Sequence, residues 1–231
     1  MAVIKTIHHC LACPFKQNLF TKLTVEELQK VNEAKLEITY NEGEIIFKQG
    51  SFITHIVALT SGLAKVYLEG ISRRNLILQY IKPAEFIGGP GTFVDKIHHF
   101  SVIASEETTA CLIPVDLFIK LIESNQQFAL GYIELISRKR ISSFELFISL
   151  TQKQMYGRVA DALLYLHNDV YTTYLEGFPL NRKDLADLTA LSKDSAGRIL
   201  NSFEESGFIK LSDNKIIILK KDQLEDISSK G

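Results

Sequence analysis

The stretch that most constrains the fold of this chain runs from residue 181 to residue 205 and reads NRKDLADLTALSKDSAGRILNSFEE. Asn181 and Ser192 each stand where a helix N-cap belongs, immediately before a run with apolar residues at helical spacing. The first run buries Leu185 and Leu188, and the second presents a longer apolar face. The members of that second face are Ala196, Ile199, Leu200 and Phe203. The stretch therefore predicts two short helices joined by a tight turn.

The polar face of the second predicted helix is charged near its N-terminus, which is the end that a DNA recognition helix inserts into the major groove. Arginine donates a bidentate pair to guanine and aspartate accepts from the cytosine amine, so Arg198 and Asp194 are candidates for reading bases. Arg182, on the first helix, is a candidate for a phosphate contact. The predicted DNA-binding residues are Arg182, Ser192, Lys193, Asp194, Ser195 and Arg198. Two capped amphipathic helices also occur in ordinary helical proteins, so this pattern alone leaves both interpretations open.

The residues after the second helix favour a winged helix-turn-helix. Gly207 can end the helix, and the β-rich runs FIKL and KIIIL then flank three turn residues, Ser212, Asp213 and Asn214. A two-stranded wing beside the helix pair strengthens the DNA-binding interpretation.

Charge gives that interpretation no bulk support. The formal net charge of the chain is −1, and residues 153–231 carry 11 Lys and Arg against 12 Asp and Glu. Neutralisation of phosphates supplies much of the affinity of proteins for DNA. A protein this neutral must therefore concentrate its basic residues on one face and bind as a dimer.

From Leu36 to about Val115 the sequence changes to short β-rich runs, among them HIVAL, LAKVYL, FSVIAS and ACLIPV. Turn residues separate the runs, as at Ser61-Gly62 and at the glycine-rich segment 88–91. No long helical pattern lies between them, which is typical of a small antiparallel sandwich or barrel. The chain as a whole is therefore predicted to be an α+β protein.

A long helical pattern follows, from Asn125 to about Leu150, after the shorter helical run VDLFIKLIES. Its apolar residues recur mostly at steps of four and three, which is the seam spacing of a coiled coil. We expect a dimer interface at Ile133, Ile136, Phe144 and Phe147. An ordinary core helix with two buried faces is the alternative.

A break near residues 151–155 marks a candidate hinge, because the next helical run begins at GRVADALL. These boundaries predict a sensor domain at residues 1–124, a dimerisation helix with hinge at 125–152, and a DNA-binding domain at 153–231. No apolar run approaches the roughly 20 residues of a membrane helix. Three cysteines, an odd number, fit a reducing compartment better than a disulfide framework, so we expect a cytoplasmic protein without membrane contact.

A barrel, a long helix and a winged helix-turn-helix in this order resemble the Crp/Fnr superfamily of bacterial transcription regulators. The resemblance extends from about Leu19 to Leu219, and its most specific segments are GLAKVY, FIGGPG, GRVADALL and LSKDSAGRILNSFEESGFI. It implies a cyclic-nucleotide-binding-like jelly roll, homodimers, double-stranded DNA as partner, contact with RNA polymerase and no enzymatic activity. Many family members have glutamate at the position of Asp194, so the base preference cannot be transferred.

Family members that bind cyclic nucleotides carry a glycine-glutamate pair for the ribose and an arginine-serine pair for the phosphate. Here Pro90 follows Gly89 where the glutamate would fall, and the strand IHHFSVIAS contains no arginine. A phosphodiester would lose its charge-assisted partner, so cyclic AMP is not expected to bind by these contacts. The candidate effector-pocket residues are Gly88, Gly89, His98, His99 and Ser101. Histidines beside a turn are otherwise typically solvated.

The cysteines suggest a different signal. Cys10 and Cys13 are spaced to bind one metal ion, and Cys111 lies near where the oxygen-sensing Fnr branch has its barrel cysteine. That branch uses four cysteines for an iron-sulfur cluster, whereas this chain has three, so His8 or His9 would have to complete a set for a cluster or for zinc. The alternative is that Cys111 is simply a buried apolar residue.

Two other classes of protein compete with a transcription regulator. A cupin-like metal-dependent barrel enzyme needs clustered histidines and glutamates, but His55, His98 and His99 are the only barrel histidines and show no closely spaced motif. A cytosolic ligand-binding protein that does not bind DNA is the other possibility. No arrangement of Ser, His and Asp and no phosphate loop indicates an enzyme.

Overall fold

The structure is a computed structural model that describes residues 3–4, 9–14, 19–71, 74–174, 176–212 and 215–231. The chain divides into two compact units. The first comprises Met1–Glu69 and Gln79–Ile141, and the second Gly70–Leu78 and Ser142–Gly231, so their boundary lies within the long helix. The finer division into 1–124, 125–152 and 153–231 stays a prediction.

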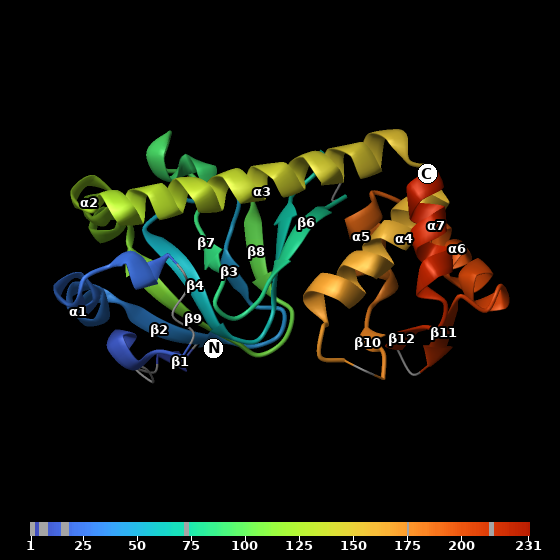
Figure 1. Cartoon of the computed structure of the whole chain (residues 1–231), viewed down its shortest axis with the longest axis horizontal. Helices are drawn as coiled ribbons and strands as arrows, with labels where there is room; N and C mark the ends of the chain where they lie inside the picture. The colour runs from blue at the N-terminus through green and yellow to red at the C-terminus, as the bar shows by residue number, and fades with distance from the viewer. Residues whose placement is uncertain (1–2, 5–8, 15–18, 72–73, 175, 213–214) are drawn as a thin grey trace. The chain divides into compact units, whose positions relative to one another are not determined.

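The first unit is built on two sheets, as the short punctuated runs predicted (Figure 1). In the five-stranded sheet the order is β1 (Val3–Ile4), β2 (Leu36–Tyr40), β9 (Thr108–Pro114), β4 (His55–Ser61) and β7 (Phe86–Ile87). In the four-stranded sheet it is β3 (Ile45–Phe47), β8 (Ser101–Ala104), β5 (Ala64–Leu68) and β6 (Leu76–Ile81). β9 pairs antiparallel with β2 and β4, with Cys111 opposite Glu37 on one side and Ala58 on the other.

The first unit contains several helices. They are η1 (Cys10–Ala12), η2 (Phe20–Lys22), α1 (Val25–Ala34), η4 (Pro90–Phe93), α2 (Val115–Ser124) and the first part of α3 (Gln126–Gln152). A capping box opens α1, since Thr24 Oγ1 accepts from Glu27 N at 3.2 Å and Glu27 Oε2 accepts from Thr24 N at 2.8 Å. The antiparallel pair of β1 with β2 was not predicted, because two residues are too short to give a pattern.

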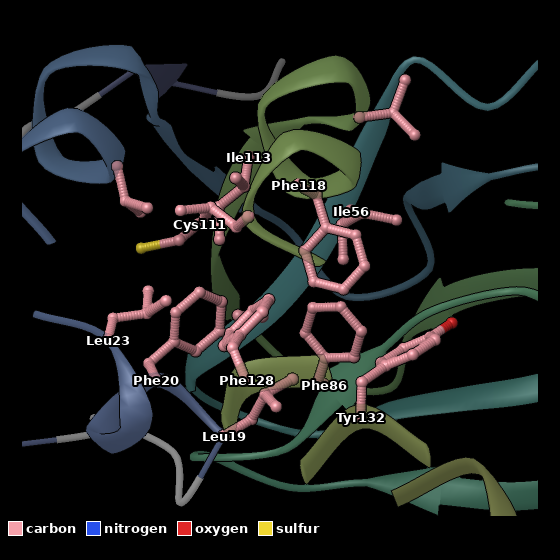
Figure 2. Packing of buried hydrophobic residues seen from close by; sticks show 14 of the residues in the cluster. Leu19, Phe20, Leu23, Ile56, Phe86, Cys111, Ile113, Phe118, Phe128 and Tyr132 are labelled. Carbon is pink, nitrogen blue, oxygen red and sulfur yellow. The ribbon is translucent and has the colours of Figure 1, made fainter. Parts of the chain in front are cut away.

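Aromatic rings form the centre of the core that joins these helices to the five-stranded sheet (Figure 2). Phe86 of β7 stacks on Phe118 of α2 with ring centroids 5.3 Å apart, and Phe118 meets Phe128 and Tyr132 of α3 edge-on. Burial of each such ring stabilises the fold by roughly 1.5–3 kcal/mol. The first half of α3 is thereby fixed to the barrel.

The second unit holds the winged helix-turn-helix. Its helices are α4 (Met155–Tyr165), the π-helical turn η5 (Leu166–Val170), α5 (Arg182–Thr189), α6 (Lys193–Glu205) and α7 (Lys221–Lys230). The wing is a three-stranded sheet in the order β10 (Phe178–Pro179), β12 (Lys215–Ile218) and β11 (Ile209–Ser212). The predicted two-stranded wing is therefore confirmed and extended by β10, while its turn residues Asp213 and Asn214 lie outside the described residues.

The predicted break after the long helix is confirmed, since α3 ends at Gln152 and α4 begins at Met155. A polar cluster around Asp161 of α4 fixes this corner. Its carboxylate accepts from Ser149 Oγ at 2.6 Å, from Lys153 Nζ at 2.8 Å and from the hydroxyl of Ser228 on α7. The end of α3, the break and α7 are thus held together within the second unit. No described helix is long and apolar enough to cross a membrane.

Candidate nucleic-acid interface and sensor site

The two helices of the predicted DNA reader begin at the predicted caps. Asn181 Oδ1 accepts from Asp184 N at 2.7 Å and opens α5, and Ser192 Oγ accepts from Ser195 N at 3.1 Å and opens α6. Ala190, in the left-handed region with φ 53°, ends α5 and turns the chain. A non-glycine residue rarely adopts this conformation, so the turn is fixed at a small cost in strain.

One face of α6 is buried and the other is open. The buried face has the predicted members Ala196, Ile199, Leu200 and Phe203, together with Gly197. The opposite side and Arg182 border a hollow of about 430 Å3, lined by Arg182, Lys193, Asp194, Gly197, Arg198 and Asn201. Four of the six predicted DNA-binding residues therefore share one concave surface.

The remaining two predicted residues stand at the tip of α6. The hydroxyls of Ser192 and Ser195 are 3.0 Å apart, and Arg198 Nη2 donates to Ser195 Oγ at 3.4 Å. Arg198 is thus held loosely beside the helix N-terminus and remains exposed. Asn201 also lines the hollow but was missed, although it lies three residues after Arg198 and hence on the same helix face.

Gly197 lies beside the Arg182 side chain. A Cβ at this position would meet Arg182 atoms at 3.5 to 3.7 Å, which is ordinary van der Waals contact. A methyl group therefore fits at this position in the free protein.

The predicted effector-pocket residues are spread over two environments. His99 is exposed and its Nε2 is 2.9 Å from Asp95 Oδ2, as expected of a solvated histidine. His98 is only 6% exposed, and its ring stacks on Phe47 with centroids 3.8 Å apart. Burial lowers the pKa of His98 to about 4, so the ring is neutral at physiological pH. The expectation of a solvated ring is wrong for His98. The ring is buried against Phe47, which is too distant in sequence to give a local pattern.

Ser101 is fully buried and satisfied by the protein itself. Its hydroxyl donates to Glu69 Oε1 at 2.6 Å and accepts from Gln49 N at 2.8 Å. The backbone N of Glu69 in turn donates to Gln49 Oε1 at 2.9 Å. The Glu69 carboxylate therefore accepts the hydrogen bond of Ser101, the serine that the family resemblance assigns to an anionic phosphate.

The glycines of the predicted pocket lie close to the core. A Cβ at Gly88 would meet the Phe86 ring at 2.7 Å, so the loop needs glycine there for close packing. At Gly89 the nearest atoms are those of Ile53, His98 and Phe100, all at 3.8 Å or more. This loop is joined to α3, since Lys139 Nζ donates to the Phe86 carbonyl at 2.7 Å.

The three cysteines are all free thiols and line one small cavity of about 50 Å3. Lys35 lies among them, with its Nζ 3.8 Å from Cys111 Sγ. Burial raises the pKa of Cys111 to about 12, which disfavours the thiolate that a metal ion requires. Within the described part of the chain, no three His, Cys, Asp or Glu side chains are arranged to hold a metal ion, and His8 lies outside that part. A metal site at Cys10, Cys13 and Cys111 therefore stays a prediction, and the described residues alone do not complete one.

The predicted dimer residues lie along one exposed stripe of α3. Ile133, Ile136, Phe144 and Phe147 are 43–54% exposed. At about 100° per residue they fall within roughly 80° of arc. The buried residues of α3, Phe128 and Tyr132, lie to one side of this stripe. The alternative of a core helix buried on two faces does not describe this stripe.

Comparison with known proteins agrees with this architecture. Residues 37–125 match the family model of the cyclic nucleotide-binding domain, and residues 157–227 match that of the Crp-like helix-turn-helix domain. The transcriptional activator protein Anr of Pseudomonas aeruginosa is 23% identical over 222 residues, which cover 94% of this chain and 91% of Anr. The nitrogen fixation regulation protein FixK of Bradyrhizobium diazoefficiens is 22% identical, covering 96% of this chain and 94% of FixK. The chain is a Crp/Fnr family transcription regulator.

Solved structures show the same fold for this Crp/Fnr regulator. FixK2 of Bradyrhizobium japonicum superimposes with a TM-score of 0.74 at 18% identity, over 83% of this chain and 96% of FixK2. The c-di-GMP responsive regulator CLP of Xanthomonas campestris gives 0.72 at 16% identity, over 84% of this chain and 99% of CLP. The match to the Crp-like helix-turn-helix domain and the likeness to the regulators Anr and FixK identify a DNA-binding transcription regulator and favour it over the cupin-like alternative.

Proposed function

We propose that this Crp/Fnr regulator binds an inverted-repeat operator as a homodimer, with α6 of each protomer in the major groove. The exposed apolar stripe of α3 carries the proposal, because two such stripes packed together would remove Ile133, Ile136, Phe144 and Phe147 from water. Two recognition helices would then address half-sites about one helical turn apart.

A dimer would also compensate for the lack of net positive charge in the second unit, which a single copy would need to bind DNA tightly. The exposed basic residues of the hollow are Arg182, Lys193 and Arg198, and dimerisation would double them on one side of the assembly. Arg198 is assigned to guanine, Asp194 to the cytosine amine, and Lys193 and Ser195 to bases or phosphates. Arg182 and Ser192 are assigned to phosphate contacts, which set register without reading sequence.

Sedimentation and gel-shift experiments on one set of proteins test this assignment. The wild type should sediment as a dimer at micromolar concentration and retard a selected duplex in a sequence-dependent manner. Lys221→Ala, which removes an exposed cation from α7, is the matched control and should leave affinity unchanged. A wild-type monomer that binds the operator with full affinity would rule out the dimer.

We further infer that cyclic AMP is not the effector of the barrel. The pair of Ser101 with the Glu69 carboxylate supports this, since an anionic phosphate would have to displace a negative charge. Calorimetry with cyclic AMP and cyclic GMP is the direct test. Heats that fit a micromolar dissociation constant would contradict the inference, and no measurable heat is expected.

The signal would pass from barrel to helix through the glycine loop. Lys139 on α3 donates to the Phe86 carbonyl, and Tyr132 on α3 meets the Phe86 ring edge-on at 6.2 Å. A movement of the segment that precedes Gly88 would therefore displace α3 through these two contacts. Lys139→Met keeps the aliphatic stem and removes the donor, so it should change the response of operator affinity to effector while leaving dimerisation intact.

Contact with RNA polymerase is proposed by analogy with Anr, which is named as a transcriptional activator. Transcription in vitro from a promoter that carries the selected operator tests it. Activation by the wild type and its loss with Arg198→Ala would support an activator, whereas repression of the same promoter would indicate a repressor.

A further inference from the structure

The cavity lined by the three cysteines belongs to a different chemistry from DNA binding. Cys10 and Cys13 flank the turn η1, and Cys111 lies in β9, about 100 residues further along the chain. Cys10 packs against the core cluster that contains Cys111, whose sulfur is visible in Figure 2. The fold therefore brings every thiol of the protein to one place.

A buried ion pair lies at the same cavity. Lys35 Nζ is 3.2 Å from Glu37 Oε2, and the two side chains are only 3% and 1% exposed. Burial acts to lower the pKa of Lys35, but the nearby Cys111, Cys10 and Glu37 raise it overall, so the ammonium persists. The ammonium is 3.8 Å from Cys111 Sγ and also interacts electrostatically with Cys10. Burial keeps Cys111 a thiol, so the ammonium favours the reactive thiolate at the partly exposed Cys10.

The two ends of the cavity differ in access. Cys10 is partly exposed at the turn, where its backbone N donates to Asn32 Oδ1 at 2.9 Å and is tied to α1. Cys111 is buried and remains a thiol. Cys13 is partly exposed as well, but Cys10 packs against the core cluster that contains Cys111, so Cys10 is the accessible thiol placed beside the buried one.

A disulfide requires fewer groups to converge in this cavity than a metal ion does. Zinc requires four ligands that converge at about 2.0–2.3 Å, and the described residues offer no such group. A disulfide joins two sulfurs instead of four ligands, although it also needs Cα atoms about 4.4–6.8 Å apart and a Cβ–S–S–Cβ dihedral of about ±90°. Cys10 lies in the three-residue turn η1, whereas Cys111 is paired between β2 and β4, so the approach of the two sulfurs would come from the turn.

We propose that Cys10 and Cys111 form a reversible disulfide when a peroxide oxidises the protein. The Cys10 thiolate attacks one peroxide oxygen, the O–O bond breaks, and Cys10 becomes a sulfenic acid while the other oxygen leaves as water after protonation. The Cys111 sulfur then attacks the Cys10 sulfur, the S–O bond breaks, and a second water leaves. Two thiols and one hydrogen peroxide thus give one disulfide and two waters, and Cys13 keeps its thiol.

Peptide mapping of the full-length protein tests this pairing. The reduced protein is treated with hydrogen peroxide, alkylated with N-ethylmaleimide and digested without reductant. One alkylated cysteine, Cys13, and one peptide that joins Cys10 to Cys111 are expected, and dithiothreitol should restore all three thiols. Cys13→Ser should still form the link, whereas Cys10→Ser and Cys111→Ser should not.

A pair of lysine variants tests the role of the ammonium. Lys35→Met should slow the loss of the Cys10 thiol at least several-fold, whereas Lys30→Met, an exposed lysine of α1, should not change it. If Cys111→Ser fails to fold, the peptide map of the wild type still decides the pairing. A Cys10–Cys13 link, a link between two chains, three thiols unchanged by peroxide, or stoichiometric iron or zinc bound to the thiols would each overturn the proposal.

Discussion

The hollow beside α6 and the interior of the barrel are built in opposite ways. The hollow is open, charged and formed by residues within 20 positions of one another, from Arg182 to Asn201. The barrel instead satisfies its polar groups with partners that are distant in sequence, as Ser101 does with Glu69 and Gln49. An open charged surface is available for a large external partner, whereas the barrel positions that the resemblance assigns to an effector are occupied by its own side chains.

The two regions therefore differ in what they offer a partner. The helix α6 has caps, an apolar face and exposed cations that suit an external duplex. In the barrel, hydrogen bonds within the protein already use the hydroxyl of Ser101.

Phe144→Glu should have the largest effect, because it places a charge in the exposed apolar stripe that we propose as the dimer interface. Loss of the dimer would remove one recognition helix from each complex and lower operator affinity by more than about 100-fold. Sedimentation at micromolar concentration should show a monomer. Glu145→Lys, exposed on another face of α3, is the matched control, and if both variants lose the dimer equally, the stripe is not the interface.

Arg198→Ala removes the side chain assigned to guanine. Operator affinity should fall by about 1–3 kcal/mol, and preference should relax at one base pair in each half-site. Arg182→Ala should instead weaken binding to all sequences alike and reduce the slope of log affinity against log salt by about 1. Gel shifts on operator and mutated duplexes at several salt concentrations separate the two. Equal loss of affinity for every sequence would contradict the assignment of Arg198.

The lowered pKa of His98 predicts that the stability of the barrel depends on pH. Its pKa is about 4 in the folded state against an ordinary value of 6.5, so the unfolded state binds the proton first as pH falls. The stability that His98 contributes is present above pH 6.5 and is lost between pH 6.5 and 4, with about 2 kcal/mol lost from pH 7 to pH 5.

Thermal unfolding at a series of pH values measures this loss. His98→Gln should flatten the pH dependence of barrel unfolding, while His99→Gln, at the exposed neighbour, should leave it unchanged. An unaltered slope in His98→Gln would show that another group is responsible.

Gly197→Ala should have the smallest effect and the opposite sign. A methyl group meets no atom closer than 3.5 Å, and alanine exceeds glycine in helix propensity, so the second unit should gain up to about 1 kcal/mol. Gly207→Ala is the matched control at the end of the same helix. Its φ of +69° strains any other residue, and the variant should lose about 1 kcal/mol. Denaturant unfolding that shows destabilisation by both would contradict this account of Gly197.

The reader could be predicted from sequence because its determinants are local. The caps Asn181 and Ser192, the stop at Gly207 and the apolar face that contains Phe203 act within a few residues of their effects. The exposed stripe of α3 was legible for the same reason, since helical spacing alone places Ile133 and Phe144 together.

The sensor could not be predicted in the same way. The burial of His98 depends on Phe47, 51 positions earlier, and the hydrogen bond of Ser101 depends on Glu69. Neither contact leaves a local pattern in the sequence. The gathering of Cys10 and Cys111 likewise follows from packing of the N-terminal turn on α1, which in turn packs against β9. Strand pairing over long separations determines such sites, and spacing in the sequence does not report it.

We propose that α6 reads DNA sequence as half of a symmetric pair. Selection of bound duplexes from a random pool tests this reading, with wild type and Arg198→Ala run in parallel at one salt concentration. The wild type should enrich an inverted repeat whose half-sites are about one helical turn apart, and Arg198→Ala should enrich the same repeat with one relaxed position in each half. Enrichment of no sequence, or of a motif that Arg198→Ala leaves unaltered, would contradict the claim.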